Sequence, residues 1–149
     1  MLRITKLTDY AVLVLSEMVR IEDAARAARD VAVSTGIPQP TVSKVLKLLA
    51  RAGVVASERG KNGGYRLARP AAAITVSEIV DAVEGPIAVT ECSTDKRGCC
   101  DLEGHCPTEA NWVRINDAIR QTLRGITLAD MAQPNFPVLI PLRRIAVEA

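Results

Sequence analysis

The spacing of apolar residues predicts three helices in the first third of the chain. Apolar positions recur every three or four residues from Lys6 to Arg20, which indicates one face of an amphipathic helix. A second helix is expected at about 24–34, ended by Gly36, because glycine tolerates the left-handed backbone found at helix ends. A third helix is expected at about 39–52. Its inward side chains are Val42, Val45, Leu46 and Leu49.

The pattern then changes to that of a β-hairpin. Residues 54–55 and 65–67 are β-rich and are separated by a glycine-rich turn. The pair Asn62-Gly63 predicts a tight turn, since both residue types accept positive φ, and Gly64 is expected to add slack. Two helices joined by a short turn and followed by a basic hairpin predict a winged helix-turn-helix.

The second half of the chain predicts three further helices. Thr75 and Glu78 have the spacing of a capping box, which begins a helix that Gly85-Pro86 ends. A helix of about 18 residues starts near Pro107, and Thr127 begins a short one. The long helix carries an apolar stripe that needs a partner, and a second copy of the chain is the simplest partner. The stripe consists of Trp112, Ile115, Ile119, Leu123 and Ile126, with Val113 beside it.

These elements predict a mainly α fold with a small β-hairpin wing, in which a winged helix-turn-helix is followed by a long dimerisation helix. We expect a DNA-binding domain at 1–85 and a cysteine-containing loop at 86–107. The dimerisation helix and a short terminal helix are expected at 108–132. The tail at 133–149 is expected to be extended, because its prolines exclude a helix.

Length and composition predict a cytoplasmic protein without a membrane partner. The 149 residues are 48% hydrophobic, which is enough for a domain with its own core. No apolar stretch reaches the roughly 20 residues of a membrane span. No signal-peptide cleavage site follows the first apolar run. Thiols stay reduced in the cytoplasm, so clustered cysteines there more often bind metal or sense redox state than form disulfides.

Charge is unevenly divided along the chain. Residues 1–70 contain 12 Lys and Arg against 6 Asp and Glu, whereas residues 71–149 contain 7 against 11. A basic first half predicts a polyanionic partner, and the winged fold makes double-stranded DNA the expected one, although such modules also bind proteins. The expected contacts from the third helix are Gln39, Thr41, Ser43, Lys44 and Lys47. The expected phosphate contacts from the wing are Arg59, Lys61 and Arg66.

All four cysteines, Cys92, Cys99, Cys100 and Cys106, lie within fifteen residues. Disulfides between them would close only short loops, so a disulfide framework is disfavoured. A zinc site is disfavoured because CxxC pairs are absent and two of the cysteines are adjacent. Iron–sulfur ligation is favoured, since three separated thiolates leave one position for a weaker ligand. His105, the only histidine, is more often a surface residue than a ligand in such a context.

Five motifs in order resemble the Rrf2 family of transcriptional regulators, which includes IscR and NsrR. They are LTDYA, TGIPQPTVSKVLKLLARAGVV, the wing ERGKNGGYRLARP, ITVSEIVDAVEG, and a cysteine loop before a tryptophan-bearing helix. The resemblance implies a homodimeric DNA-binding repressor or activator with a [2Fe-2S] or [4Fe-4S] cluster. The details TECS, CDLEGHC, NW, IN and LADM most resemble the branch that regulates the SUF genes of iron–sulfur assembly.

The same resemblance implies a ligand set. Family members place five residues between the last two ligand cysteines, which leaves Cys99 as a substitute or redox partner. Asp9 stands where nitric-oxide-sensing relatives place a carboxylate from the other subunit. Glu109 stands where IscR-like members place a histidine, and it is an alternative ligand together with His105. The implied ligands are Cys92, Cys100, Cys106 and Asp9.

Two other functions fit parts of the pattern. The cysteines suit a zinc- or thiol-based redox-sensing repressor, and they also suit an iron–sulfur carrier that passes clusters to client enzymes. The positive charge of residues 38–69 argues against a carrier, which needs no polyanion-binding face. An enzyme is not expected, because the chain contains neither a histidine–acid–nucleophile set nor a phosphate-binding loop.

Overall fold

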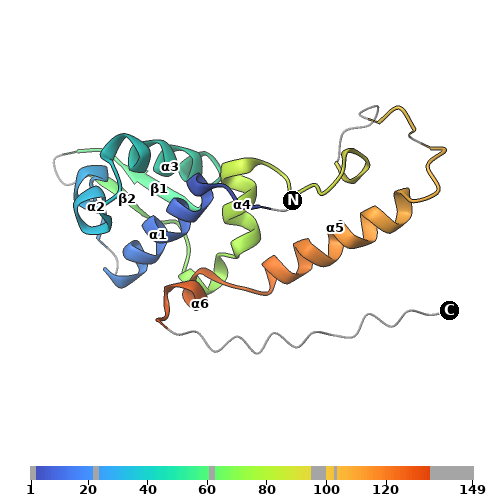
Figure 1. Cartoon of the computed structure of the whole chain (residues 1–149). Helices are drawn as coiled ribbons and strands as arrows, with labels where there is room; N and C mark the ends of the chain where they lie inside the picture. The colour runs from blue at the N-terminus through green and yellow to red at the C-terminus, as the bar shows by residue number, and fades with distance from the viewer. Residues whose placement is uncertain (1–2, 22–23, 61–62, 95–99, 103, 135–149) are drawn as a thin grey trace.

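The computed structural model describes residues 3–21, 24–60, 63–94, 100–102 and 104–134 (Figure 1). Its architecture is mainly helical with one two-stranded antiparallel sheet, as predicted. The helices are α1 (Lys6–Arg20), α2 (Ala28–Thr35), α3 (Gln39–Arg51), α4 (Val76–Glu84), α5 (Glu109–Arg124) and α6 (Leu128–Ala132), with 3-10 turns η1 (Ala71–Ala73) and η2 (Glu91–Ser93). The strands are β1 (Val55–Glu58) and β2 (Gly64–Leu67).

Within the described ranges, no helix is both long and apolar enough to cross a membrane.

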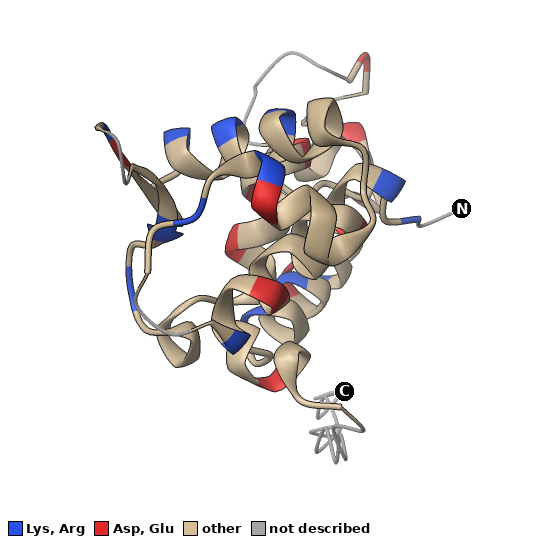
Figure 2. Cartoon of the chain, turned by 90° about the vertical axis from the view of Figure 1, so that its left-hand side faces the viewer, with Lys and Arg blue, Asp and Glu red and all other residues tan. Residues whose placement is uncertain are grey.

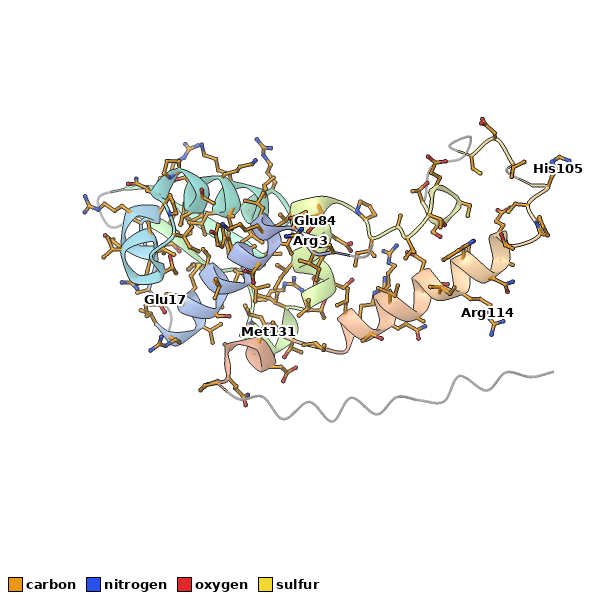
Figure 3. The ribbon with its side chains drawn as sticks, in the orientation of Figure 1. Arg3, Glu17, Glu84, His105, Arg114 and Met131 are labelled. Carbon is orange, nitrogen blue, oxygen red and sulfur yellow. The ribbon has the colours of Figure 1, made fainter. Side chains whose placement is uncertain are left out.

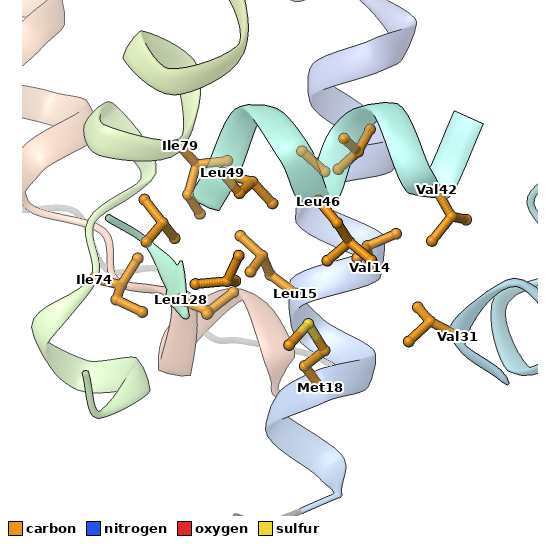
Figure 4. Packing of buried hydrophobic residues seen from close by; sticks show 14 of the residues in the cluster. Val14, Leu15, Met18, Val31, Val42, Leu46, Leu49, Ile74, Ile79 and Leu128 are labelled. Carbon is orange, nitrogen blue, oxygen red and sulfur yellow. The ribbon is translucent and has the colours of Figure 1, made fainter. Parts of the chain in front are cut away.

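The core is built around α1, which packs against α2, α3, α4 and α6 (Figure 4). Its inward residues Val14 and Leu15 have no solvent exposure. The predicted inner face of α3 is confirmed, since its four apolar side chains are also fully buried. Ile79 from α4 and Leu128 from α6 complete the cluster. Each such leucine or isoleucine stabilises the fold by about 1.5–3 kcal/mol relative to an exposed side chain.

The chain returns to this core after α5. Leu128 is fully buried, and its backbone N–H donates to Ile74 O at 2.8 Å. Val76 N donates to Ile126 O at 2.9 Å, so the starts of α4 and α6 are joined side by side. Both starts have the capping box expected from the sequence: Thr75 with Glu78 in α4, and Thr127 with Asp130 in α6.

The expected second helix was wrong at its beginning. The sequence predicted a start near residue 24, whereas α2 begins at Ala28. Arg26 instead extends the sheet: its N–H donates to Tyr65 O at 2.9 Å, and Tyr65 N donates to Arg26 O at 2.8 Å. Pairing with a strand about forty residues away overrides the local helical preference of this alanine-rich segment.

The turn of the wing also differs from the prediction. β1 and β2 pair from Val55 with Leu67 to Glu58 with Gly64, so Gly64, which was expected in the turn, is the first residue of β2. Gly60 has the positive φ, 117°, whereas Gly63 does not. Gly64 does not provide slack. A Cβ there would lie 2.4 Å from the carbonyl oxygen of Arg26, so glycine is required for the strand to approach that segment.

α5 projects away from the rest of the molecule (Figure 1). It begins at Glu109 and has 16 residues, with Thr108 at the cap position and Pro107 preceding it. It contacts α4 and η2. Two residues of its predicted apolar stripe, Trp112 (39%) and Ile115 (44%), are exposed in the single chain, as is Val113 (38%) beside them. Of the tail expected at 133–149, residues 135–149 lie outside the described part of the chain.

The close approach at Gly64 predicts a stability loss on substitution. In Gly64→Ala the new methyl group would meet backbone atoms of Arg26, which cannot turn away as a side chain can. We expect the free energy of unfolding to fall by about 1–3 kcal/mol, the usual range for overpacking. Urea denaturation followed by circular dichroism measures this.

Gly125→Ala is the matched control, because its Cβ would make only ordinary contacts, the nearest at 3.4 Å, at a backbone conformation that alanine accepts. We expect its stability to change by no more than about 0.5 kcal/mol. Equal stability of the two variants would contradict the close approach between Gly64 and Arg26.

Candidate DNA interface and cysteine segment

The outer face of α3 carries the polar and basic side chains predicted to contact DNA. Gln39, Lys44 and Lys47 are exposed, while Thr41 and Ser43 are half-buried. A shallow groove of about 470 Å³ follows this face and is lined by Pro40, Ser43, Lys44, Lys47, Leu48 and Arg51. The Lys and Arg positions of α3 lie together at the top of the molecule, beside the wing (Figure 2). A helix with this face suits the major groove of B-form DNA.

The wing offers less free positive charge than the sequence predicted. Arg59 is exposed and makes no ion pair with the described residues, whereas Lys61 lies outside them. The guanidinium of Arg66 forms an ion pair with Glu58, its neighbour across the hairpin. Glu58 therefore competes with a phosphate for Arg66. Glu58 is the single acid at 38–69, and its partner could not be predicted from the sequence because it depends on the strand register.

The three cysteines in the described residues are free thiols, and each is half-buried. Cys92 lies in η2, Cys100 follows the undescribed residues 95–99, and Cys106 lies just before α5. Cys99 lies outside the described part. Within the described ranges of one chain, no three side chains of His, Cys, Asp or Glu lie together as a metal-binding group. The structure thus places the thiols in one segment without gathering them at a single point.

Two of these thiols have a threonine hydroxyl as neighbour. Cys92 Sγ lies 3.2 Å from Thr90 Oγ1, and Cys106 Sγ lies 3.3 Å from Thr108 Oγ1. Hydrogen bonds from the hydroxyl and the backbone N–H of Thr108 lower the pKa of the Cys106 thiol. Thiolate is the form that binds metal and attacks disulfides, so this neighbour favours both kinds of chemistry.

The alternative ligands lie at the same end of α5. His105 is exposed, as expected for a surface residue (Figure 3). Glu109 is the first residue of α5, and its Oε2 accepts a hydrogen bond from Gly104 N at 3.4 Å. That contact joins the residues on the two sides of Cys106, which gives the Glu109 carboxylate a structural role.

A buried asparagine of α5 holds the start of the cysteine segment, residues 86–107. Asn116 is 4% exposed, and its Oδ1 accepts a hydrogen bond from Val89 N at 3.1 Å. Asp81 Oδ1 accepts another from Ile87 N at 3.3 Å. These bonds position the chain that leads to Cys92. Sequence reasoning missed Asn116, although a lone polar residue beside an apolar stripe was a signal for such a role.

Asp9 is exposed in the first turn of α1, next to a tie between α1 and α4. The hydroxyl of buried Thr8 donates to Glu84 Oε1, and Thr5 N donates to the same oxygen at 3.0 Å. The Thr8 bond, followed by the Thr5 bond, lowers the pKa of Glu84, so its carboxylate form is favoured. Glu84 ends α4, from which the cysteine segment departs (Figure 3). Figure 1 shows that segment well away from α1 of the same chain.

The model of the Rrf2 family, described as iron-dependent transcriptional regulators, matches residues 4–134. The chain belongs to the Rrf2 family. Protein aau3 of Rhizobium meliloti (strain 1021) is 33% identical to it over 143 residues, which cover 95% of this chain and 93% of the relative. The HTH-type transcriptional regulator ORF2 of Azotobacter vinelandii is 34% identical over 131 residues, covering 87% and 79%.

Solved structures agree with this assignment. CymR, the global cysteine regulator of B. subtilis, superposes with a TM-score of 0.69 at 29% identity, covering 89% of this chain and 97% of CymR. IscR of T. potens superposes with a TM-score of 0.64 at 26% identity, covering 87% and 85%. The predicted winged helix-turn-helix is therefore confirmed. As an Rrf2 protein the chain is a DNA-binding transcriptional regulator and not an enzyme.

The ion pair in the wing predicts that Glu58 weakens DNA binding. In Glu58→Gln the guanidinium of Arg66 is released, so affinity for any duplex should rise. The slope of log K against log salt should steepen by up to about 0.9, the value for one added phosphate contact. Fluorescence anisotropy of a labelled duplex between low and moderate salt measures both quantities.

Glu17→Gln is the charge-matched control, because Glu17 pairs with Arg20 near the end of α1, away from α3 (Figure 3). It should change the slope much less. Equal slopes for Glu58→Gln and the unmodified protein would show that Arg66 does not reach phosphate.

The bond to Asn116 predicts a second effect. Asn116→Ala leaves the Val89 N–H without its acceptor, which costs about 1–3 kcal/mol where the group stays buried. It should also speed alkylation of Cys92 by iodoacetamide. Tryptic cleavage after Lys96 and Arg97 separates Cys92 from the other cysteines, so mass spectrometry can follow it alone.

Asn111→Ala serves as control, since Asn111 is an exposed asparagine on the same helix. Its stability and its Cys92 alkylation rate should match those of the unmodified protein. A Cys92 rate unaffected by Asn116→Ala would contradict the positioning role.

Proposed function

We propose that this Rrf2 protein is a homodimeric, cytoplasmic repressor that carries an iron–sulfur cluster and controls genes of SUF iron–sulfur assembly. The observation that carries the proposal is the set of three free thiols in one segment at the end of α5. The Rrf2 family includes iron–sulfur regulators such as IscR, which supports the same cofactor. The SUF target rests on the sequence details TECS, CDLEGHC and LADM.

The donor set fits an iron–sulfur cluster chemically. Cys92, Cys100 and Cys106 would hold it as thiolates, with Cys99 not required. Because the described residues of one chain do not gather three such donors, the segment would have to close up around iron. When bound, a cluster would supply a centre sensitive to oxygen, nitric oxide or iron supply. The residues 86–107 would then form the cluster-binding loop.

The fourth ligand is assigned to Asp9 of the partner subunit. Asp9 is exposed, and its position in the first turn of α1 leaves the carboxylate free to reach another chain. Figure 1 shows α1 and the cysteine segment apart within one chain, which favours a donor supplied in trans. Glu109 is the weaker candidate, because its carboxylate already accepts the Gly104 N–H.

Dimerisation would use the exposed apolar side chains of α5. Trp112, Val113 and Ile115 are each more than a third exposed, and together they form one contiguous part of the helix. Burial against a second α5 would remove this area from water. The long helices would then bring each cysteine segment towards the α1 of the other chain.

DNA recognition would use both recognition helices of the dimer. Gln39, Thr41, Ser43 and Lys44 are the base-reading candidates, and Lys47, Arg59 and Lys61 the phosphate contacts, joined by Arg66 where Glu58 releases it. Two such helices must sit about 34 Å apart to read successive major grooves. The cysteine loop and α1 would be tied together by the ligands, so loss of the cluster would change that spacing.

A thiol-based redox sensor is the second candidate. Thr108 lowers the pKa of the Cys106 thiol, which favours direct reaction with oxidants. CymR, a global cysteine regulator, has the same fold at 29% identity. In that case the cysteines would respond as thiols without a metal.

Purification without oxygen distinguishes the two. The proposal predicts brown protein that contains iron and acid-labile sulfide and absorbs in the visible range. Cys92→Ala, Cys100→Ala and Cys106→Ala should each lose the colour, while Cys99→Ala, the matched control, should keep it. One zinc per chain without sulfide, or colourless protein after anaerobic reconstitution with iron and sulfide, would rule out the cluster.

The same preparation tests Asp9. A carboxylate binds cluster iron less strongly than a thiolate, so Asp9→Cys should lengthen the life of the cluster in air and Asp9→Ala should shorten it. Asp30→Ala, at the exposed start of α2, is the control and should have no effect. In a mixed dimer of Asp9→Ala with Cys106→Ala, ligation in trans retains half the cluster, whereas ligation in cis damages both sites.

A further inference from the structure

A cavity of about 450 Å³ lies at the base of the wing, apart from the outer face of α3 and from the cysteine segment. The end of α1 lines it through Met18, Val19 and Ile21. Residues 66–71, which run from β2 into η1, also line it, as does Arg26. Its volume is within the range of small-molecule sites. We propose that this cavity is an effector site for a small organic carboxylate with an apolar body.

The walls provide for an apolar body. Met18, Val19 and Leu67 contribute aliphatic side chains that pack against the core yet border the cavity. Ala68 and Ala71 add small side chains that leave room. A hydrocarbon or aromatic group placed here would gain roughly 25 cal/mol for each Å² of apolar surface removed from water.

The charge of the site comes from one arginine. Three arginines line the cavity, but two are already paired: Arg66 with Glu58, and Arg69 with Glu78 at 2.7 Å. Arg26 has no ion pair with the described residues. Its Nη1 is buried and has no hydrogen-bond acceptor among them. A buried, unpaired N–H of a charged group is unfavourable, and an acceptor from a ligand would remove that cost.

The charge also selects the ligand class. One unpaired guanidinium balances one negative charge, so a monoanion fits better than a pyrophosphate or a nucleotide triphosphate. Carboxylates accept two parallel hydrogen bonds from a guanidinium, which makes them well matched to arginine. A monocarboxylate with an apolar group satisfies both the cation and the walls.

The position of Arg26 is fixed in advance. Its backbone forms two hydrogen bonds with Tyr65, at 2.9 and 2.8 Å, and glycine at position 64 permits this close approach. The guanidinium is therefore carried by a segment that moves with β2. Pre-positioning of this kind reduces the entropy lost on binding.

The location connects the site to DNA binding. Arg66 lines the cavity and also belongs to the wing, so a ligand there would fix the wing relative to α1. The coupling is reciprocal: if the ligand changes the affinity of the protein for DNA by some factor, DNA changes the affinity of the protein for the ligand by the same factor. The lining residues fall within 18–71, so this regulation would act without the cysteines and does not rest on the proposed cluster.

Calorimetry on the full-length, metal-free protein tests the site. The probes are benzoate and octanoate, with benzamide as the neutral analogue and inorganic phosphate as the anion without an apolar body. We expect saturable binding of one carboxylate per chain, and at least tenfold weaker binding of benzamide and phosphate. Absence of saturable binding for both carboxylates at millimolar concentration would overturn the proposal, as would phosphate binding equal to benzoate binding.

Arg26→Met removes the guanidinium and keeps the aliphatic stem. It should weaken carboxylate binding at least tenfold while circular dichroism and the melting temperature show a folded protein. Arg29→Met is the matched control, because Arg29 is 76% exposed, pairs with Asp30 and does not line the cavity. An equal loss in both variants would mean general charge attraction and would overturn the site. If Arg26→Met does not fold, Arg26→Gln tests the same loss of carboxylate binding. The comparison of benzoate with benzamide tests the charge requirement on the unmodified protein.

Two further outcomes would assign Arg26 elsewhere. If Arg26→Met lowers the salt slope of DNA binding by about 0.9 and no carboxylate binds, Arg26 contacts a phosphate of DNA and the effector site is wrong. If only the double variant Glu22→Gln with Asp23→Asn binds benzoate, the chain supplies its own carboxylate to Arg26, and the proposal is equally wrong. Anisotropy with a labelled duplex should show that saturating benzoate shifts DNA affinity at least threefold, and no shift would overturn the regulatory role.

Discussion

The packing of α1 is the constraint on which the rest of the structure depends. Its inward face contacts α2, α3, α4 and α6 at once, and its buried residues Val14 and Leu15 have no solvent exposure. α3, which carries the candidate DNA-binding face, and α4, from which the cysteine segment leaves, are therefore both positioned by the same helix. A rotation of α1 would have to move both, because a close-packed core transmits small shifts rather than absorbing them.

The hydrogen bond between Thr8 and Glu84 couples α1 to the end of α4. Thr8 is buried in α1, and Glu84 is the last residue of α4, so the hydrogen bond joins α1 to the point where the chain leaves α4 towards the cysteines. Asp9 follows Thr8 on the exposed side. In the proposed dimer, a pull on Asp9 from the partner's loop would act on the helix that already holds Glu84. The signal would then travel through one turn of helix rather than through a long chain of contacts.

The features that the sequence predicted are those set by near neighbours. The amphipathic pattern of 6–20, the inner face of the third helix and the capping boxes at Thr75 and Thr127 each depend on residues three or four apart, and all are confirmed. The misplaced features depend on distant partners. Arg26 leaves the expected helix because it pairs with Tyr65, and Arg66 is neutralised because the register places Glu58 beside it.

The candidate site divides in the same way. Residue types and spacing marked the cysteines and the basic face of α3, but they could not predict the partner of Asn116, because Val89 lies 27 positions earlier in the chain. Nor could they predict a contact between Asp9 and the thiols, since in the proposed dimer that contact depends on a second chain. Cys99 and Lys61 lie outside the described residues, so their roles remain predictions from sequence.

Ion pairs within the chain reduce the positive charge that the basic half of the protein can offer to DNA. Seven bases at 38–69 suggest a broad attraction for DNA, yet Glu58 and Glu78 neutralise Arg66 and Arg69. Among the described members of these seven bases, the ones without an ion pair to a described residue are Lys44, Lys47 and Arg51 on α3, and Arg59. Attraction is thus strongest where the recognition helix lies and weaker at the base of the wing. This charge distribution favours base recognition by α3 over uniform contact with the DNA phosphates. A ligand in the proposed cavity at the base of the wing could then change the position of the wing.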